Sequence, residues 1–250
     1  MSRLVIVLFT VLLLTSCTQD SLVSMQQNLA HVAQEKLKNT LAIIFTKELG
    51  KGVKTIIAAL AQRGGYLDNP LVRILLPPPL GLAIDVARDM SANPKANLLV
   101  TLMNHAAEQA IPGAAPIIHA ALAKTTPAQM RRLLDGDKTA VTDYLKAETK
   151  ESLRETLAPV VAANLAVGGA QQVYSELLDA HQAQKADVLD IFGEAADNEK
   201  HDLAQYVTGK AVDGVFKKLG AQEVIIRENI DNQAGSMLQE IENGLSNTSQ

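Results

Sequence analysis

Apolar residues that recur at the spacing of an α-helix are the feature that most constrains this fold. Between residues 22 and 61 they repeat about every four positions, which places them on one face of a helix. We expect this helix to break or kink at Gly50 and Gly52 and to end at Gly64-Gly65, because glycine commonly follows the last helical turn. The repeating residues are Leu29, Ala33, Leu37, Leu41, Phe45 and Leu49.

Start and stop signals divide the rest of the chain into further helices. Asn93-Pro94 and Thr126-Pro127 each supply a capping side chain followed by a first-turn proline. The chain is rich in alanine and leucine, only 3% of its residues are aromatic, and its sequence has no strand or hairpin pattern. We therefore predict an all-α fold, a single multi-helix, bundle-like domain. The expected segments are 80–90, 95–110, 114–124, 127–135, 139–167 with a kink or restart at Pro159, 170–181, 186–192, 202–228 and 234–243.

Residues 64–80 interrupt this helical pattern. Four prolines exclude helix through most of the segment, yet it is apolar, unlike a solvated loop. One interpretation is an extended, proline-rich strap whose apolar side chains seal one side of the bundle. The other is an edge that binds a ligand or partner. Its candidate binding residues are Tyr66, Asp68, Asn69 and Arg73.

Cys17 is the only cysteine and follows a short apolar N-terminal run. Arg3 precedes this run, which has the length of a signal-peptide core and is too short to span a bilayer. Leu14-Thr15-Ser16-Cys17 resembles the cleavage and acylation signal of bacterial lipoproteins. The resemblance implies a membrane anchor of lipid, such as palmitate, attached to Cys17. An ordinary signal peptide with a chance cysteine is the alternative.

This interpretation divides the chain into a signal peptide (1–16), a lipidated tether (17–21) and a helical domain (22–250). Aspartate after the cysteine commonly marks retention in the inner membrane, but here Thr18 follows. The resemblance therefore implies the inner leaflet of the outer membrane, facing the periplasm.

Charge and cysteine content exclude several classes of function. The chain has a formal net charge of −4 and no basic patch of the kind that binds nucleic acid. With its one thiol bound to lipid, the mature domain has no disulfide and no cysteine-ligated metal. We expect no cofactor.

Several blocks of sequence resemble an uncharacterised bacterial lipoprotein family, domain of unknown function 4197. The likeness extends over roughly residues 40–230, although Leu75 replaces a usual proline and His105 a usual arginine. It implies a helical fold in the cell envelope and transfers no catalytic residue. The matching blocks are Gly65–Pro70, Val72–Leu80, Met103–Glu108, the group from Gly136 to Tyr144, and Tyr206–Phe216.

Several polar residues in these blocks are of types that bind metals or ligands. His105 and Glu108 have a spacing that metal sites use, but further ligands are not apparent, so a surface histidine is the simpler interpretation. Asn104, Glu108 and Asp213 are candidate binding residues, and a buried hydrogen bond next to Gly214 explains Asp213 equally well. No motif pairs a nucleophile with a base, so no catalytic residue is predicted.

Three hypotheses follow. The preferred one is a non-enzymatic, lipid-anchored helical protein that binds an envelope partner or supports the envelope. The second is a carrier or sensor of an apolar small molecule or lipid, closed by residues 64–80. The third is an enzyme that uses Glu108 or Asp213 as an acid or base, which requires both side chains to meet in one cleft.

Overall fold

The computed structural model describes residues 2–81, 93–192 and 202–247, and within these ranges it contains helices and no strand. The architecture is therefore all-α, as the sequence predicts. The helix expected at 80–90 lies almost entirely outside the described residues. The elements are α1 (Ser2–Leu60), α3 (Pro94–Ala110), the 3-10 helix η2 (Ile111–Gly113), α4 (Ala114–Lys124), α5 (Pro127–Leu134), α6 (Ala140–Val167), α7 (Ala170–Phe192) and α8 (Leu203–Asn247).

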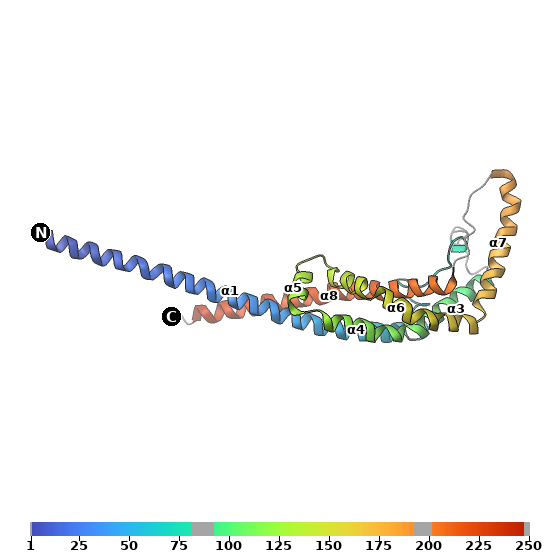
Figure 1. The fold of residues 1–250 in the computed structure, drawn as a ribbon, viewed down its shortest axis with the longest axis horizontal. Coiled ribbons are helices and arrows are strands. Elements are labelled where there is room, and N and C mark those ends of the chain that lie inside the picture. Colours follow the sequence, from blue (N-terminus) through green and yellow to red (C-terminus); the bar gives the residue numbers. More distant parts are fainter. Residues whose placement is uncertain (1, 82–92, 193–201, 248–250) are drawn as a thin grey trace.

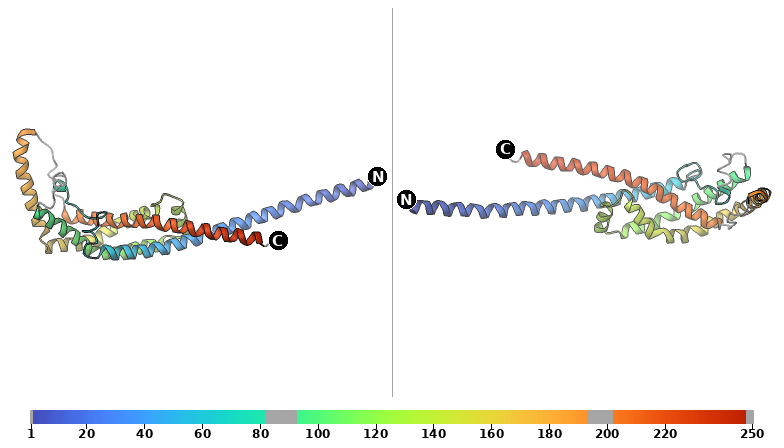
Figure 2. Two further views of the ribbon diagram at one scale, coloured as in Figure 1. Left: turned by 180° about the vertical axis from the view of Figure 1, so that it is seen from behind. Right: turned by 90° about the horizontal axis from the view of Figure 1, so that it is seen from above.

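The molecule is elongated, with a packed body and projecting helix ends (Figure 1). Helix α6 packs against α8 and α3, and α1 runs along α8. The N-terminal part of α1 and the C-terminal part of α8 leave the body at the same end and diverge, whereas α7 projects at the other end (Figure 2). None of the described helices is both long and apolar enough to cross a membrane.

The helix ends follow the predicted signals. Asn93 accepts hydrogen bonds from the Lys95 and Ala96 amides at the start of α3. Thr126 and Gln129 form a capping box at the start of α5, in which each side chain accepts from the other residue's amide. After α1, Gly64 has a φ of +83°, a backbone conformation that glycine adopts without strain.

The expected break in α1 at Gly50 and Gly52 is wrong, because the helix runs through both residues. Gly52 instead allows close packing, because a Cβ there would lie 3.0 Å from Cγ of Gln222 in α8. A Cβ on Gly50 would lie 3.6 Å from Leu122 in α4, which is an ordinary contact. Residues 17–21, expected as a tether, also lie within α1.

Two further boundaries are corrected. Segments 170–181 and 186–192 form the single helix α7, because residues between them contain no glycine or proline. Segments 202–228 and 234–243 likewise form the single helix α8, in which buried Ile226 and Ile230 continue the apolar face across the expected gap. Pro159 lies inside α6, which is one helix rather than two.

Candidate functional site

Residues 64–80, here called the 64–80 segment, are part of the hydrophobic core. Residues 61–79, which follow α1, form turns and irregular backbone. From Val72 to Leu76, side chains alternate between buried and exposed, as they do in a strand. The inward side chains Val72, Ile74 and Leu76 join Tyr66, which is 0% exposed, in the core. The segment therefore fills the core instead of closing over a hollow.

Asn104 of α3 holds the segment through its side-chain amide. Its Oδ1 accepts from the Ile74 amide at 2.8 Å, and its Nδ2 donates to the Ile74 carbonyl at 2.8 Å. Nδ2 also donates to the Val100 carbonyl at 2.7 Å. The Asn104 side chain thus makes the hydrogen bonds that a neighbouring strand would make to Ile74. It satisfies backbone groups that would be costly to bury without a partner.

Glu108, one turn further along α3, holds the turn that begins the segment. Its Oε1 accepts from the amides of Tyr66 at 3.1 Å and Leu67 at 3.3 Å. His105 Nδ1 lies 3.6 Å from Oε2, and the histidine side chain is half exposed. Across the described ranges, no cluster of His, Cys, Asp or Glu has the size needed to hold a metal. Glu108 therefore has a structural role in this arrangement.

Helix α8 holds the other side of the segment. The Tyr66 hydroxyl donates to the Ala211 carbonyl at 2.8 Å, and Lys217 Nζ donates to the Leu71 carbonyl at 3.0 Å. A Cβ on Gly214 would lie 2.9 Å from Cε1 of Tyr66 and 3.2 Å from Cβ of Val72. Gly214 therefore makes room for the 64–80 segment against α8.

The stability of the protein should fall at alkaline pH because of Tyr66. Burial of the phenol, followed by the charge of Glu108, raises the pKa of Tyr66 above its ordinary value. The unfolded chain then ionises first, so this stabilisation is complete below a pH of about 10 and declines as the pH rises further. Tyr66→Phe should flatten the decline in the free energy of unfolding, measured by urea titration above that pH. A decline as steep as that of Tyr144→Phe, the matched control, would contradict this assignment.

The remaining predicted residues do not join this cluster. Asp68 and Arg73 are exposed, and Asn69 accepts from the Leu71 amide within its own turn. Asp213 is not buried: it is 56% exposed and pairs with Lys146 at 2.8 Å. The hollows that Asp213 lines do not include Glu108. These hollows therefore do not provide, among the described residues, the shared cleft that an acid/base pair of Glu108 and Asp213 requires.

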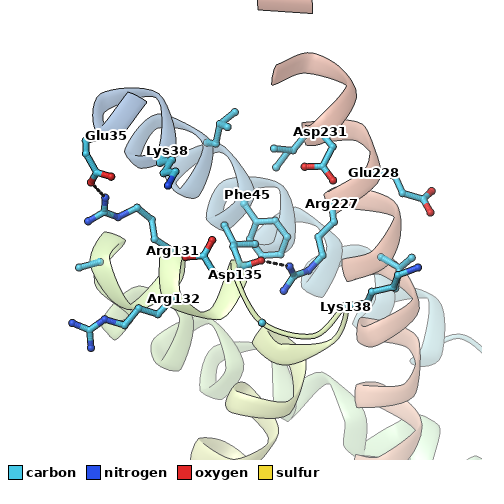
Figure 3. Close-up of a pocket in the computed structure, with 16 residues that line it drawn as sticks. Glu35, Lys38, Phe45, Arg131, Arg132, Asp135, Lys138, Arg227, Glu228 and Asp231 are labelled. Carbon is cyan, nitrogen blue, oxygen red and sulfur yellow. Dashed lines mark hydrogen bonds and ion pairs between the residues drawn. The ribbon is translucent and has the colours of Figure 1, made fainter. Parts of the chain in front are cut away.

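A larger hollow lies elsewhere, where α1 and α8 leave the body beside α5 (Figure 3). Its volume is about 720 Å³, within the range of roughly 300–1,000 Å³ typical of small-molecule pockets. We call it the α1/α5/α8 pocket. Its apolar lining comes from Leu41, Phe45, Ala128, Leu134, Val224 and Ile230.

A buried ion pair on α8 shapes one wall of this pocket. Arg227 donates to Oε1 of Glu223 at 2.8 Å and to the carbonyls of Leu133 and Leu134 at the end of α5. Glu223 accepts from the amides of Val141 at 3.1 Å and Thr142 at 2.7 Å, in the first turn of α6. An acid thus meets a helix N-terminus and a base meets a helix C-terminus, the favourable arrangement for both dipoles. The pair joins α5 and α6 through α8.

The rim of the pocket carries both signs of charge. Arg131 of α5 pairs with Glu35 of α1, and this hydrogen bond lowers the pKa of Glu35. Nε of Arg131 is buried and has no hydrogen-bond partner among the described residues, an arrangement that costs about 1–3 kcal/mol. Six other charged side chains line the pocket without an ion pair in the described structure: Lys38, Arg132, Lys138, Asp135, Glu228 and Asp231.

A family model described as "Protein of unknown function" matches residues 32–241. The chain belongs to the DUF4197 family. The predicted family is thereby confirmed, and its lipoprotein character stays a prediction. Comparisons with curated proteins and with solved structures found no match.

The matched range of this DUF4197 protein includes both the 64–80 segment and the α1/α5/α8 pocket, and Cys17 precedes it. The sequence patterns described above did not predict the pocket. One signal was present: Glu223 shares a helix face with Leu219 and Ile226, so a charge interrupts an apolar stripe. A charge at such a position needs a partner, and Arg227 follows one turn later.

Proposed function

We propose that the protein is a lipoprotein of the cell envelope whose helical body binds a small apolar or amphipathic molecule as a carrier or sensor. Acylated Cys17 is its anchor, and the periplasmic side of the outer membrane is its location. At about 1.5 Å per residue, the part of α1 between Cys17 and buried Ala42 extends over roughly 37 Å. This length supports an anchor held away from the packed body (Figure 1).

The α1/α5/α8 pocket is the observation that carries the binding role. It is large enough for a small ligand and combines an apolar lining with charged groups at the rim. It favours the carrier or sensor hypothesis over partner binding alone. The 64–80 segment does not serve as its lid, because that segment packs into the core and lines other hollows.

The anchor is tested by Cys17→Ser in cells supplied with radioactive palmitate. The variant should lose the label and its sedimentation with membranes, because the acylated sulfur is absent. Thr18→Ser keeps the thiol and should retain both. A Cys17→Ser protein that is still labelled and still sediments with membranes would refute the anchor.

The ligand is tested by native mass spectrometry of the full chain released from membranes. We expect a bound small molecule that is lost in Ala128→Trp, whose indole would fill the pocket from exposed Ala128. Ala147→Trp, at an exposed position on α6, should keep the molecule. A protein without bound mass, or with mass that remains in Ala128→Trp, would refute binding in this pocket.

A further inference from the structure

We infer that the ligand of the α1/α5/α8 pocket is a zwitterionic amphiphile: an acidic group and an ammonium group joined to an apolar chain. The inference rests on the proposed ligand-binding function and defines the chemistry of the ligand. A zwitterionic lipid headgroup with its chain has these features, and so does a small zwitterion without the chain.

The two sides of the pocket differ in their balance of charge. On the α1 and α5 side, Lys38, Arg131 and Arg132 lie with Glu35 and Asp135, and on the α8 side, Glu228 and Asp231 lie with Arg227 and Lys138 (Figure 3). When the ion pairs Arg131–Glu35 and Arg227–Glu223 are set aside, cations outnumber acids on the first side and acids outnumber cations on the second. Among the charged side chains that line the pocket without an ion pair, the lysines and arginines equal the aspartates and glutamates in number. A ligand with a single sign of charge would meet repulsion as well as attraction here. A ligand with both signs can place each group against the opposite wall.

The cationic wall has unused hydrogen-bond donors. Nε of Arg131 is buried without a partner among the described residues, although Glu35 binds another nitrogen of the same guanidinium. An anionic oxygen placed against Nε would accept a hydrogen bond from it. Charge-assisted hydrogen bonds of this kind are stronger than neutral ones.

The apolar lining lies between the two charged walls. Phe45 is fully buried under the guanidinium of Arg227, whose Cζ lies 5.8 Å from the ring centroid. Leu41 and Val224 are partly exposed beside it, one from α1 and one from α8. Leu41 and Val224 offer an apolar surface to a hydrocarbon chain, which a small zwitterion would leave uncovered. The structure therefore favours a headgroup with its chain.

The inference is tested by titrating the full chain, held in amphipol, with amphiphiles of one chain length. The probes are a lysophosphatidylethanolamine, a lysophosphatidylglycerol and an alkyltrimethylammonium, with phosphoethanolamine as the headgroup without a chain. We expect the zwitterionic lysolipid to bind about tenfold more tightly than the anionic or cationic probe, since each of those lacks one charge-assisted contact. It should also bind more tightly than phosphoethanolamine.

Charge reversals show which wall binds which group. Lys38→Glu should shift the preference toward the cationic probe, and Asp231→Lys toward the anionic probe. Both positions are exposed, so the fold should tolerate the changes. Lys47→Glu and Glu155→Lys reverse exposed charges away from the pocket and should leave the order of affinities unchanged.

Each other outcome overturns a defined claim. An anionic or cationic probe that binds as tightly as the zwitterion, yet is blocked by Ala128→Trp, overturns the ligand class and leaves the proposed function standing. Phosphoethanolamine that binds as tightly as the lysolipid overturns the need for a chain. Unchanged preference in both Lys38→Glu and Asp231→Lys overturns the assignment of the walls. If no probe binds and native mass spectrometry finds no ligand, the proposed function fails as well.

Discussion

Replacing Glu223 by alanine should lower the free energy of unfolding by about 3–5 kcal/mol, the usual cost of breaking a buried ion pair on one side. Glu223 is 0% exposed and accepts from the amides of Val141 and Thr142 as well as from Arg227. Its loss leaves two amides at the start of α6 and a half-buried guanidinium without their acceptor. Urea unfolding followed by circular dichroism measures the change.

Glu228→Ala provides the matched control for this prediction. Glu228 lies on the same helix but is exposed and has no ion pair in the described structure. Its removal should change the free energy of unfolding by less than about 0.5 kcal/mol, as is usual for surface positions. Equal effects of the two substitutions would show that the Glu223–Arg227 pair does not join α5 and α6.

Tyr66→Ala should destabilise the protein by a similar amount, about 3–5 kcal/mol, by the usual cost of removing a large aromatic side chain from a core. The ring is fully buried and packs against Gly214 of α8, and its hydroxyl donates to the Ala211 carbonyl. Alanine would leave a cavity between the 64–80 segment and α8 and would remove the hydrogen bond to the Ala211 carbonyl. The free energy of unfolding from urea titration is again the measurement.

Tyr66→Phe separates the two contributions of this side chain. Phenylalanine fills the same volume and loses only the hydrogen bond, so we expect a cost of about 0.5–1.5 kcal/mol. If the alanine variant were no less stable than the phenylalanine variant, the packing of the ring against Gly214 would not stabilise the fold.

Local sequence signals predicted most helix ends correctly. Asn93-Pro94 and Thr126-Pro127 begin helices, because a cap side chain and a proline satisfy or remove the first amides without help from distant residues. Val207, Ala211, Val215 and Leu219 recur every four residues along α8, and all four lie in the core. Signals of this kind depend on residues only a few positions apart.

Glycine was the misleading signal, because its effect depends on what packs against it. Gly50 and Gly52 were expected to break α1, yet the helix is unbroken and Gly52 packs closely against Gln222 of α8. Gly214 similarly admits the 64–80 segment. At Gly64 the same residue type adopts a positive φ in the turns that follow the end of α1 at Leu60.

The candidate site, like the helices, was predicted only in part from the sequence. Sequence by itself determined the helical class and the membership in DUF4197, and it singled out Tyr66, Asn104 and Glu108 as candidate binding residues. Only the tertiary structure decided that these three residues hold a core segment and that the pocket lies at α1, α5 and α8. The physical reason is distance along the chain: Arg227 donates to a carbonyl 93 residues away, and Glu223 accepts from amides more than 80 residues away. Such contacts form only when the helices pack.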